Sequence, residues 1–138
     1  CKEAHGMQYI EALHHVGLPT ANMKATVEFY GSLGGKVVFE KDDVEAGQPI
    51  QVKHINFHGV LLECYERTET AQCPGAVDHL AFKVHDIDEM YALCKEKGFT
   101  LFEDCADAIG HSTYWPKGTR WFIVIGPNAE KIEFCTEG

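Results

Sequence analysis

The sequence has few basic residues relative to acidic ones. Its 138 residues contain 12 lysines and arginines against 21 aspartates and glutamates, which gives a formal net charge of −9. Nucleic-acid binding depends on clustered basic side chains that neutralise phosphates, and anionic membrane surfaces attract polybasic segments. The charge balance therefore argues against both nucleic acid and membrane surfaces as partners.

Long apolar runs and paired cysteines are also missing. No stretch approaches the roughly 18 apolar residues of a membrane span, and residues 1–6 lack the apolar core of a signal peptide. We interpret residues 1–6 as a cloning scar before a natural start at Met7, and we expect a cytoplasmic protein. None of the six cysteines forms a Cys-x-x-Cys pair, which argues against a zinc ribbon. Cys64, Cys94 and Cys135 lie in apolar runs and are expected to be small buried residues.

The chain contains an internal repeat with an offset of 64 residues, the separation of His15 and His79. The segment 13–18 resembles 77–82, and the same offset superimposes Asn22 on Asp86 and Gly34 on Gly98. Each copy reads as strand, helix and further strands. We therefore predict one domain at 8–138, with module one at about 10–66, a linker at 67–75 and module two at about 76–137.

Local signals predict the limits of the elements. Asn22 and Asp86 are good N-caps for the two helices, and Gly34 and Gly98 are typical of their ends. The pairs His58-Gly59 and Pro127-Asn128 indicate turns. Strands are expected at 11–19, 36–40, 50–57 and 60–65 in the first copy, and at 77–84, 100–103, 111–114 or 120–125, and 131–136 in the second.

Each copy carries one histidine on its first strand and one glutamate on its last. These residues are His15 and Glu63 in copy one and His79 and Glu133 in copy two. Any one of them alone is more often a hydrogen-bonded or solvated structural residue. A carboxylate inside an apolar run is costly unless it is paired or binds a metal, and both glutamates lie in such runs at matching positions. Two imidazoles and two carboxylates suit a divalent Ni, Co, Fe, Mn or Zn ion.

His14 competes with His15, because neighbouring residues on a strand face opposite sides of the sheet. The repeat favours His15, since His14 matches Asp78 and only His15 matches a histidine. The same parity predicts that Tyr65 shares a face with Glu63, and that Cys135 shares one with Glu133.

The sequence resembles the vicinal oxygen chelate (VOC) superfamily, and within it glyoxalase I (lactoylglutathione lyase). The resemblance spans about 10–137 and is carried by Leu13–Val16, Val27–Tyr30, Leu33-Gly34, Val60–Glu63, Asp78–Phe82, Gly126–Asn128 and Lys131–Glu133. It implies an α+β fold in which two βαβββ modules form a curved, mostly antiparallel metal-binding cup. This is the fold of glyoxalases, bleomycin resistance proteins and dihydroxybiphenyl dioxygenases. It also implies that one divalent metal per site is bound by His15, Glu63, His79 and Glu133.

The resemblance further implies a lyase or isomerase that transfers a proton on a 2-oxoaldehyde thiol adduct or related small carbonyl compound. Glu133 is the first candidate for the base and Glu63 the second. The candidate substrate contacts are Lys83, Tyr65, Arg120 and Trp115, the last in an aromatic loop at 106–121. Relatives commonly pair modules between chains, so we expect a homodimer with shared sites.

Two departures bear on the substrate. Glyoxalase I often has arginine four residues after the first metal histidine, where this chain has Pro19, and asparagine where it has Arg67. Glutathione is therefore expected to fit poorly. The alternatives are a CoA-ester or sugar-acid epimerase of the same superfamily and a non-catalytic, antibiotic-sequestering binding protein. Bound metal would separate the enzymes from the binding protein.

Overall fold

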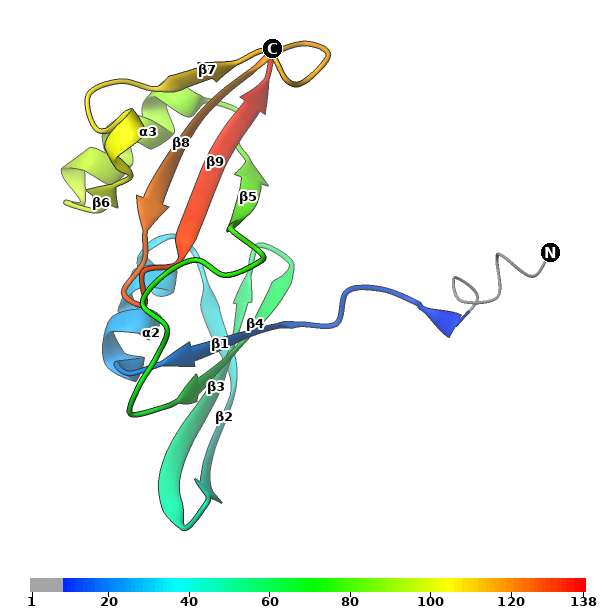
Figure 1. The fold of residues 1–138 in the computed structure, drawn as a ribbon, viewed down its shortest axis with the longest axis vertical. Helices are drawn as coiled ribbons and strands as arrows, with labels where there is room; N and C mark the ends of the chain where they lie inside the picture. The colour runs from blue at the N-terminus through cyan, green and yellow to red at the C-terminus, as the bar shows by residue number, and fades with distance from the viewer. Residues whose placement is uncertain (1–8) are drawn as a thin grey trace.

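The computed structural model describes residues 9–138, so the segment interpreted as a cloning scar lies outside the described residues. Two βαβββ modules follow one another along the chain, and each forms its own sheet (Figure 1). The expected α+β fold of two modules is confirmed. The strands of the first sheet are, in spatial order, β1 (Val16–Thr20), β4 (Val60–Glu66), β3 (Gln48–Phe57) and β2 (Lys36–Glu45).

The second sheet repeats this arrangement. Its strands are, in spatial order, β5 (His79–Lys83), β9 (Lys131–Glu137), β8 (Thr119–Ile125) and β6 (Thr100–Leu101), with β7 (Gly110–Ser112) also paired to β8. In both modules the first strand runs parallel to the last, and the other pairs are antiparallel. The sequence left 111–114 and 120–125 as alternatives, and both segments form strands.

Both helices begin and end where the sequence predicts. The Asn22 side chain caps α2 (Met23–Ser32) by accepting from the Ala25 amide, and Asp86 caps α3 (Ile87–Glu96) by accepting from Glu89. Gly34 and Gly98 follow these helices with φ of 97° and 75°. Such angles suit glycine because it has no Cβ.

Several strand limits differ from the prediction. The strand expected at 11–19 begins only at Val16, so His15 lies just before β1 and not on it, and the strand expected at 77–84 spans His79–Lys83. The β2–β3 hairpin extends to Glu45, because Ala46 and Gly47 take the positive φ angles of a tight turn that matches strand twist. The strand expected at 100–103 ends at Leu101. A 3₁₀ turn, η2 (Glu103–Cys105), follows because the buried Cys105 thiol packs against the backbone of Ile123.

Alternation along the last strand of each module fixes which side chains face the core. Leu62 and Cys64 on β4, and Ile132 and Phe134 on β9, are at most 4% exposed and lie on the side covered by the helices. The intervening residues must therefore point to the opposite, helix-free face. This face carries the candidate ligands.

Hydrogen bonds join the two modules through α2 rather than through their sheets. Tyr30 donates to Glu130 over 2.8 Å, and the Asn128 amide donates to Thr26 over 3.0 Å. Figure 1 shows α2 beside the turn between β8 and β9. The edge strands β1 and β5 consequently remain in separate sheets within one chain.

Across residues 9–138, no helix is long and apolar enough to cross a membrane.

Candidate metal centre

Module one brings His15 and Glu63 together through parallel pairing of β1 with β4. Gly17 is the register partner of Glu63, and His15 lies two residues before Gly17, just ahead of the start of β1. The His15 Nε2 atom lies 4.0 Å from Glu63 Oε2, with both side chains more than a third exposed. The His14 and His15 Nδ1 atoms share a hydrogen bond of 2.8 Å, which leaves His15 Nε2 facing the glutamate.

Module two repeats the pair on β5 and β9. Ala81 is the register partner of Glu133, and His79 Nε2 lies 3.7 Å from Glu133 Oε1. His79 Nδ1 donates to Asp78 over 2.9 Å, and Lys131 also contacts Asp78. Hydrogen bonding from His79 holds the pKa of Asp78 below its usual value. A carboxylate on the outer imidazole nitrogen is the usual means of orienting a metal-binding histidine.

The two glutamates differ in exposure. The Glu133 side chain is 18% exposed and that of Glu63 is 37% exposed. Burial raises the pKa of Glu133, and the nearby His79 lowers it in part. Burial therefore disfavours the charged form of Glu133, which suits a carboxylate that accepts a proton.

The four ligand-type residues meet in two pairs and not in one group. Among the described residues, no cluster of three or more histidine, cysteine, aspartate or glutamate side chains is arranged to hold a metal ion. The donor chemistry of each pair suits a divalent ion, but a pair supplies only half of the expected set. One pair lies in each sheet, because β1 and β5 belong to different sheets within the chain.

A cavity of about 900 Å³ opens over the helix-free face of module two. Lys83 and Trp115, two of the predicted substrate contacts, line it together with Glu133 and Cys135. Trp115 and its neighbour Tyr114 are 60% and 94% exposed at the rim. Cys135 is only partly buried, unlike Cys64 and Cys94, so its predicted burial is wrong in degree.

Arg120 does not line this cavity. Its guanidinium donates two hydrogen bonds to Asp88 at the start of α3, over 2.9 and 2.7 Å. Arg120 alternates with the cavity-lining Trp121 along β8 and so points to the other face.

Tyr65 lies on the helix-free face of module one, two residues from Glu63. The Arg67 guanidinium stacks on its ring at 4.6 Å and forms an ion pair with Glu45 over 2.9 Å. Pro19 is the register partner of Tyr65 on β1. The Arg67 guanidinium thus lies against Tyr65, and Glu45 already neutralises it.

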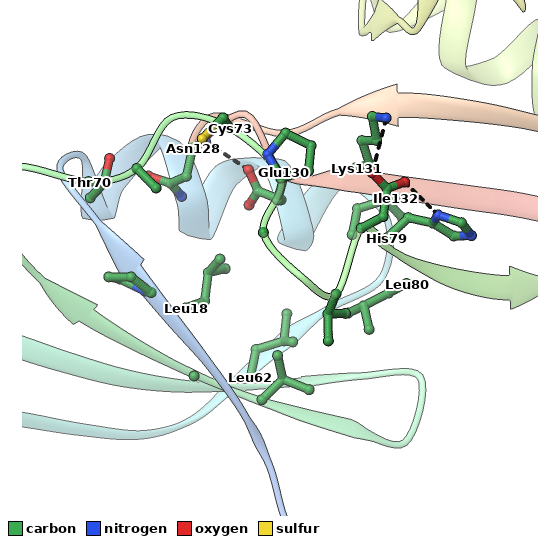
Figure 2. Close-up of a pocket in the computed structure, with 18 of the residues that line it drawn as sticks. Leu18, Leu62, Thr70, Cys73, His79, Leu80, Asn128, Glu130, Lys131 and Ile132 are labelled. Carbon is green, nitrogen blue, oxygen red and sulfur yellow. Dashed lines mark hydrogen bonds and ion pairs between the residues drawn. The ribbon is translucent and has the colours of Figure 1, made fainter.

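A second cavity of about 320 Å³ lies between the modules, where the linker crosses (Figure 2). Leu18 and Leu62 from module one and Leu80 and Ile132 from module two line it. Its Glu130 carboxylate is already bound by Tyr30 and by the Asn128 backbone amide. His79 is one of the residues that line this cavity, and Figure 2 shows its ring at the edge of the cavity, away from the linker.

The structure adds one residue that the sequence reasoning missed. His54 on β3 is the register partner of Glu63, and its Nε2 atom lies 3.5 Å from Glu63 Oε2. The tight turn at His58-Gly59 could have identified His54 as the partner of Glu63 from the sequence alone. In a two-residue hairpin Phe57 faces Val60, so counting outward from the turn pairs His54 with Glu63.

Solved structures with the same fold come from several bacteria. A glyoxalase family protein from Enterococcus faecalis matches with a TM-score of 0.72 and 21% identity, covering 92% of this chain and 98% of that chain. A glyoxalase/bleomycin resistance protein/dioxygenase from Alicyclobacillus acidocaldarius matches with a TM-score of 0.63 and 19% identity, covering 91% of each chain. The fosfomycin resistance protein FosX from Listeria monocytogenes, complexed with Mn(II) and sulfate, matches with a TM-score of 0.70 and 15% identity, covering 94% of each chain.

No curated protein matches the chain. The family model of the Glyoxalase/Bleomycin resistance protein/Dioxygenase superfamily matches residues 12–132, which is most of the sequence and includes both modules except for the last residues of β9. The resemblance drawn from the sequence is thereby confirmed at the level of the superfamily. The chain belongs to the glyoxalase/bleomycin resistance/dioxygenase (VOC) superfamily.

Proposed function

We propose that the protein is a divalent-metal-dependent lyase or isomerase of the glyoxalase I type. Its substrate would be a 2-oxoaldehyde thiol adduct or a related small carbonyl compound, with a proton transferred at the carbon next to the carbonyl. One observation carries this proposal. In both modules a histidine at or just before the start of the first strand lies within 4.0 Å of a glutamate on the last strand, which runs parallel to the first.

A homodimer would complete the metal site. Each chain offers two ligand pairs that do not meet, so module one of one subunit and module two of its partner would together supply His15, Glu63, His79 and Glu133. Within the described part of the chain, β1 and β5 are both sheet edges with no strand on their outer side. Such edges are ready to pair with another chain. The Mn(II) in the Listeria protein of similar fold supports a divalent ion as the metal.

The residues of this chain would then have different roles in the reaction. A bound divalent ion would act as a Lewis acid that makes the carbon next to the carbonyl more acidic. Glu133 would take the proton as general base, because it is the more buried carboxylate, and Glu63 is the second candidate. Asp78 would hold the His79 ring in orientation through its hydrogen bond to Nδ1.

Lys83, Trp115 and Tyr65 remain the proposed substrate contacts. Lys83 and Trp115 line the cavity that also contains Glu133, and Tyr65 lies beside Glu63 on the same face of β4. The lysine would attract an anionic group of the substrate as a point charge. Because Arg120 is engaged by Asp88 outside the cavity, we leave it out of the proposed contacts.

Metal binding is the decisive test. Protein stripped with a chelator would be titrated calorimetrically with Ni, Co, Mn and Zn, and one ion per chain is expected from two shared sites in a dimer. His15→Ala should abolish binding, whereas the matched variant His14→Ala should only weaken it. Protein that stays metal-free with every ion would refute the enzyme and favour the binding protein.

An epimerase of CoA esters or sugar acids is the second candidate. The favouring observation is that Pro19 offers no hydrogen-bond donor for a glutathione carboxylate, and that the nearby Arg67 is paired with Glu45. The same proton transfer would serve this reaction. A panel of hemithioacetals, CoA esters and sugar acids assayed with the metal-loaded protein would separate the two.

A further inference from the structure

Glu63 lies between two imidazoles. Its Oε2 atom is 3.5 Å from His54 Nε2 and 4.0 Å from His15 Nε2. The two histidines approach from different strands, His54 from β3 on one side of β4 and His15 from the β1 side. Only His15 belongs to the proposed ligand set, so His54 has a different role or none.

A β-bulge brings an aromatic ring against His54. Val37 pairs with Ile55 and Phe39 pairs with His54, so that Val38 is the extra residue between them. Without the bulge, Val38 would face His54. The Phe39 and His54 rings are 4.9 Å apart between centroids and inclined by 38°. This contact limits rotation of the imidazole, and bulges often direct a side chain in this way near functional sites.

Module two has no equivalent of this arrangement. The register partner of Glu133 on β8 is Ile123, which has no side-chain donor. Among the described residues, His79 is the one imidazole in ion-pair distance of Glu133. The two half-sites are therefore unequal although the repeat relates them. Glu63 has an imidazole within 4.0 Å on both sides, and Glu133 has one on a single side.

We propose that His54 is a positioning residue that holds the Glu63 carboxylate in the orientation in which it binds metal, with Phe39 keeping the imidazole in place. This inference rests on the proposed metal site. The 3.5 Å contact is an ion-pair distance and not a formed hydrogen bond. With its proton on Nε2, the imidazole would direct an N–H toward Oε2 and leave the other oxygen and further lone pairs of the carboxylate for an ion. Glu63 then belongs to the fixed half of the site, and Glu133 is the carboxylate left to move the proton.

The test compares variants that keep or remove the donor. His54→Phe keeps a ring against Phe39 but has no donor, whereas His54→Gln keeps an N–H. Loss of such an outer contact typically lowers metal affinity about 10- to 100-fold. We expect a loss of that size in His54→Phe, substantial recovery in His54→Gln, and an intermediate loss in Phe39→Ala. His85→Phe, an exposed histidine outside the site, is the control and should bind as wild type does. Circular dichroism melting curves would verify that each variant is folded.

A second measurement needs no metal. Long-range ¹H–¹⁵N NMR spectra of the metal-free protein report the ring nitrogens of each histidine. The His54 signals should shift in Glu63→Gln and stay in place in Glu133→Gln. Insensitivity of His54 to Glu63→Gln would overturn the inference, as would wild-type metal affinity in His54→Phe. A loss in His54→Phe equal to that in His15→Ala, without recovery in His54→Gln, would make His54 a ligand and also overturn it. A wild-type protein that binds no metal would refute the proposed function, while the NMR comparison would still decide the contact.

Discussion

Subunit complementation tests whether the two ligand pairs belong to one site. One chain would carry His15→Ala and Glu63→Gln, which disable module one. The other would carry His79→Ala and Glu133→Gln, which disable module two. Each variant alone has one intact pair per chain, and a pair is too few to hold the ion in either the intrachain or the shared arrangement.

The structure determines the expected magnitude. If module one of each subunit works with module two of its partner, a heterodimer has one site with four intact ligands and one with none. Its metal content and activity should be half those of the wild-type dimer. Random reassociation of equal amounts makes about half of the twofold-symmetric dimers mixed, so the mixture should recover about one quarter of the sites.

The assay is co-expression with two different affinity tags, which allows the heterodimer to be purified through both. Elemental analysis and calorimetric titration would then count the sites per dimer, with the two homodimeric variants as controls. A purified heterodimer that binds no metal, while wild type binds one ion per chain, would refute the shared site. A wild-type protein that is a monomer at full metal occupancy in light scattering would refute it as well.

Three further predictions concern single residues. Glu133→Gln should lower kcat by about 10²- to 10⁴-fold, the usual contribution of general acid–base catalysis, while the melting temperature changes little. A fully active variant would show that Glu133 is not the base and would favour Glu63. Tyr30→Phe removes a hydrogen bond to a carboxylate, worth about 1.5–3 kcal/mol, and should lower the free energy of unfolding in urea by that amount. Tyr91→Phe loses a bond to a neutral carbonyl and should cost less, about 0.5–1.5 kcal/mol; equal costs would contradict this reasoning. The glutathione–methylglyoxal hemithioacetal should turn over poorly, because proline at position 19 cannot form an ion pair with a glutathione carboxylate. The reaction is followed by ultraviolet absorbance. A typical rate of about 10 per second would contradict this prediction and indicate that Arg67 leaves Glu45 and binds the carboxylate instead.

Local sequence signals were sufficient for the order of the elements, the limits of the helices and the faces of β4 and β9, but not for every strand limit. The helix caps Asn22 and Asp86 and the turn at His58-Gly59 depend on short-range backbone chemistry, which a few neighbouring residues specify. Alternation along β4 and β9 then put Glu63 and Glu133 on the helix-free side. The repeat extended this to the histidines and selected His15 over His14.

Long-range packing decided the rest. The bond from Tyr30 to Glu130 joins residues 100 positions apart, and the two ligand pairs lie in separate sheets. The pairing of Arg120 with Asp88, which removes a predicted substrate contact, likewise joins distant elements. The bulge that sets Phe39 against His54 is a property of a strand pair and not of either strand alone. The sequence by itself predicted four candidate metal ligands and the strand face on which Glu63 and Glu133 lie. Only the tertiary structure decided which of them meet, because that depends on how whole modules pack.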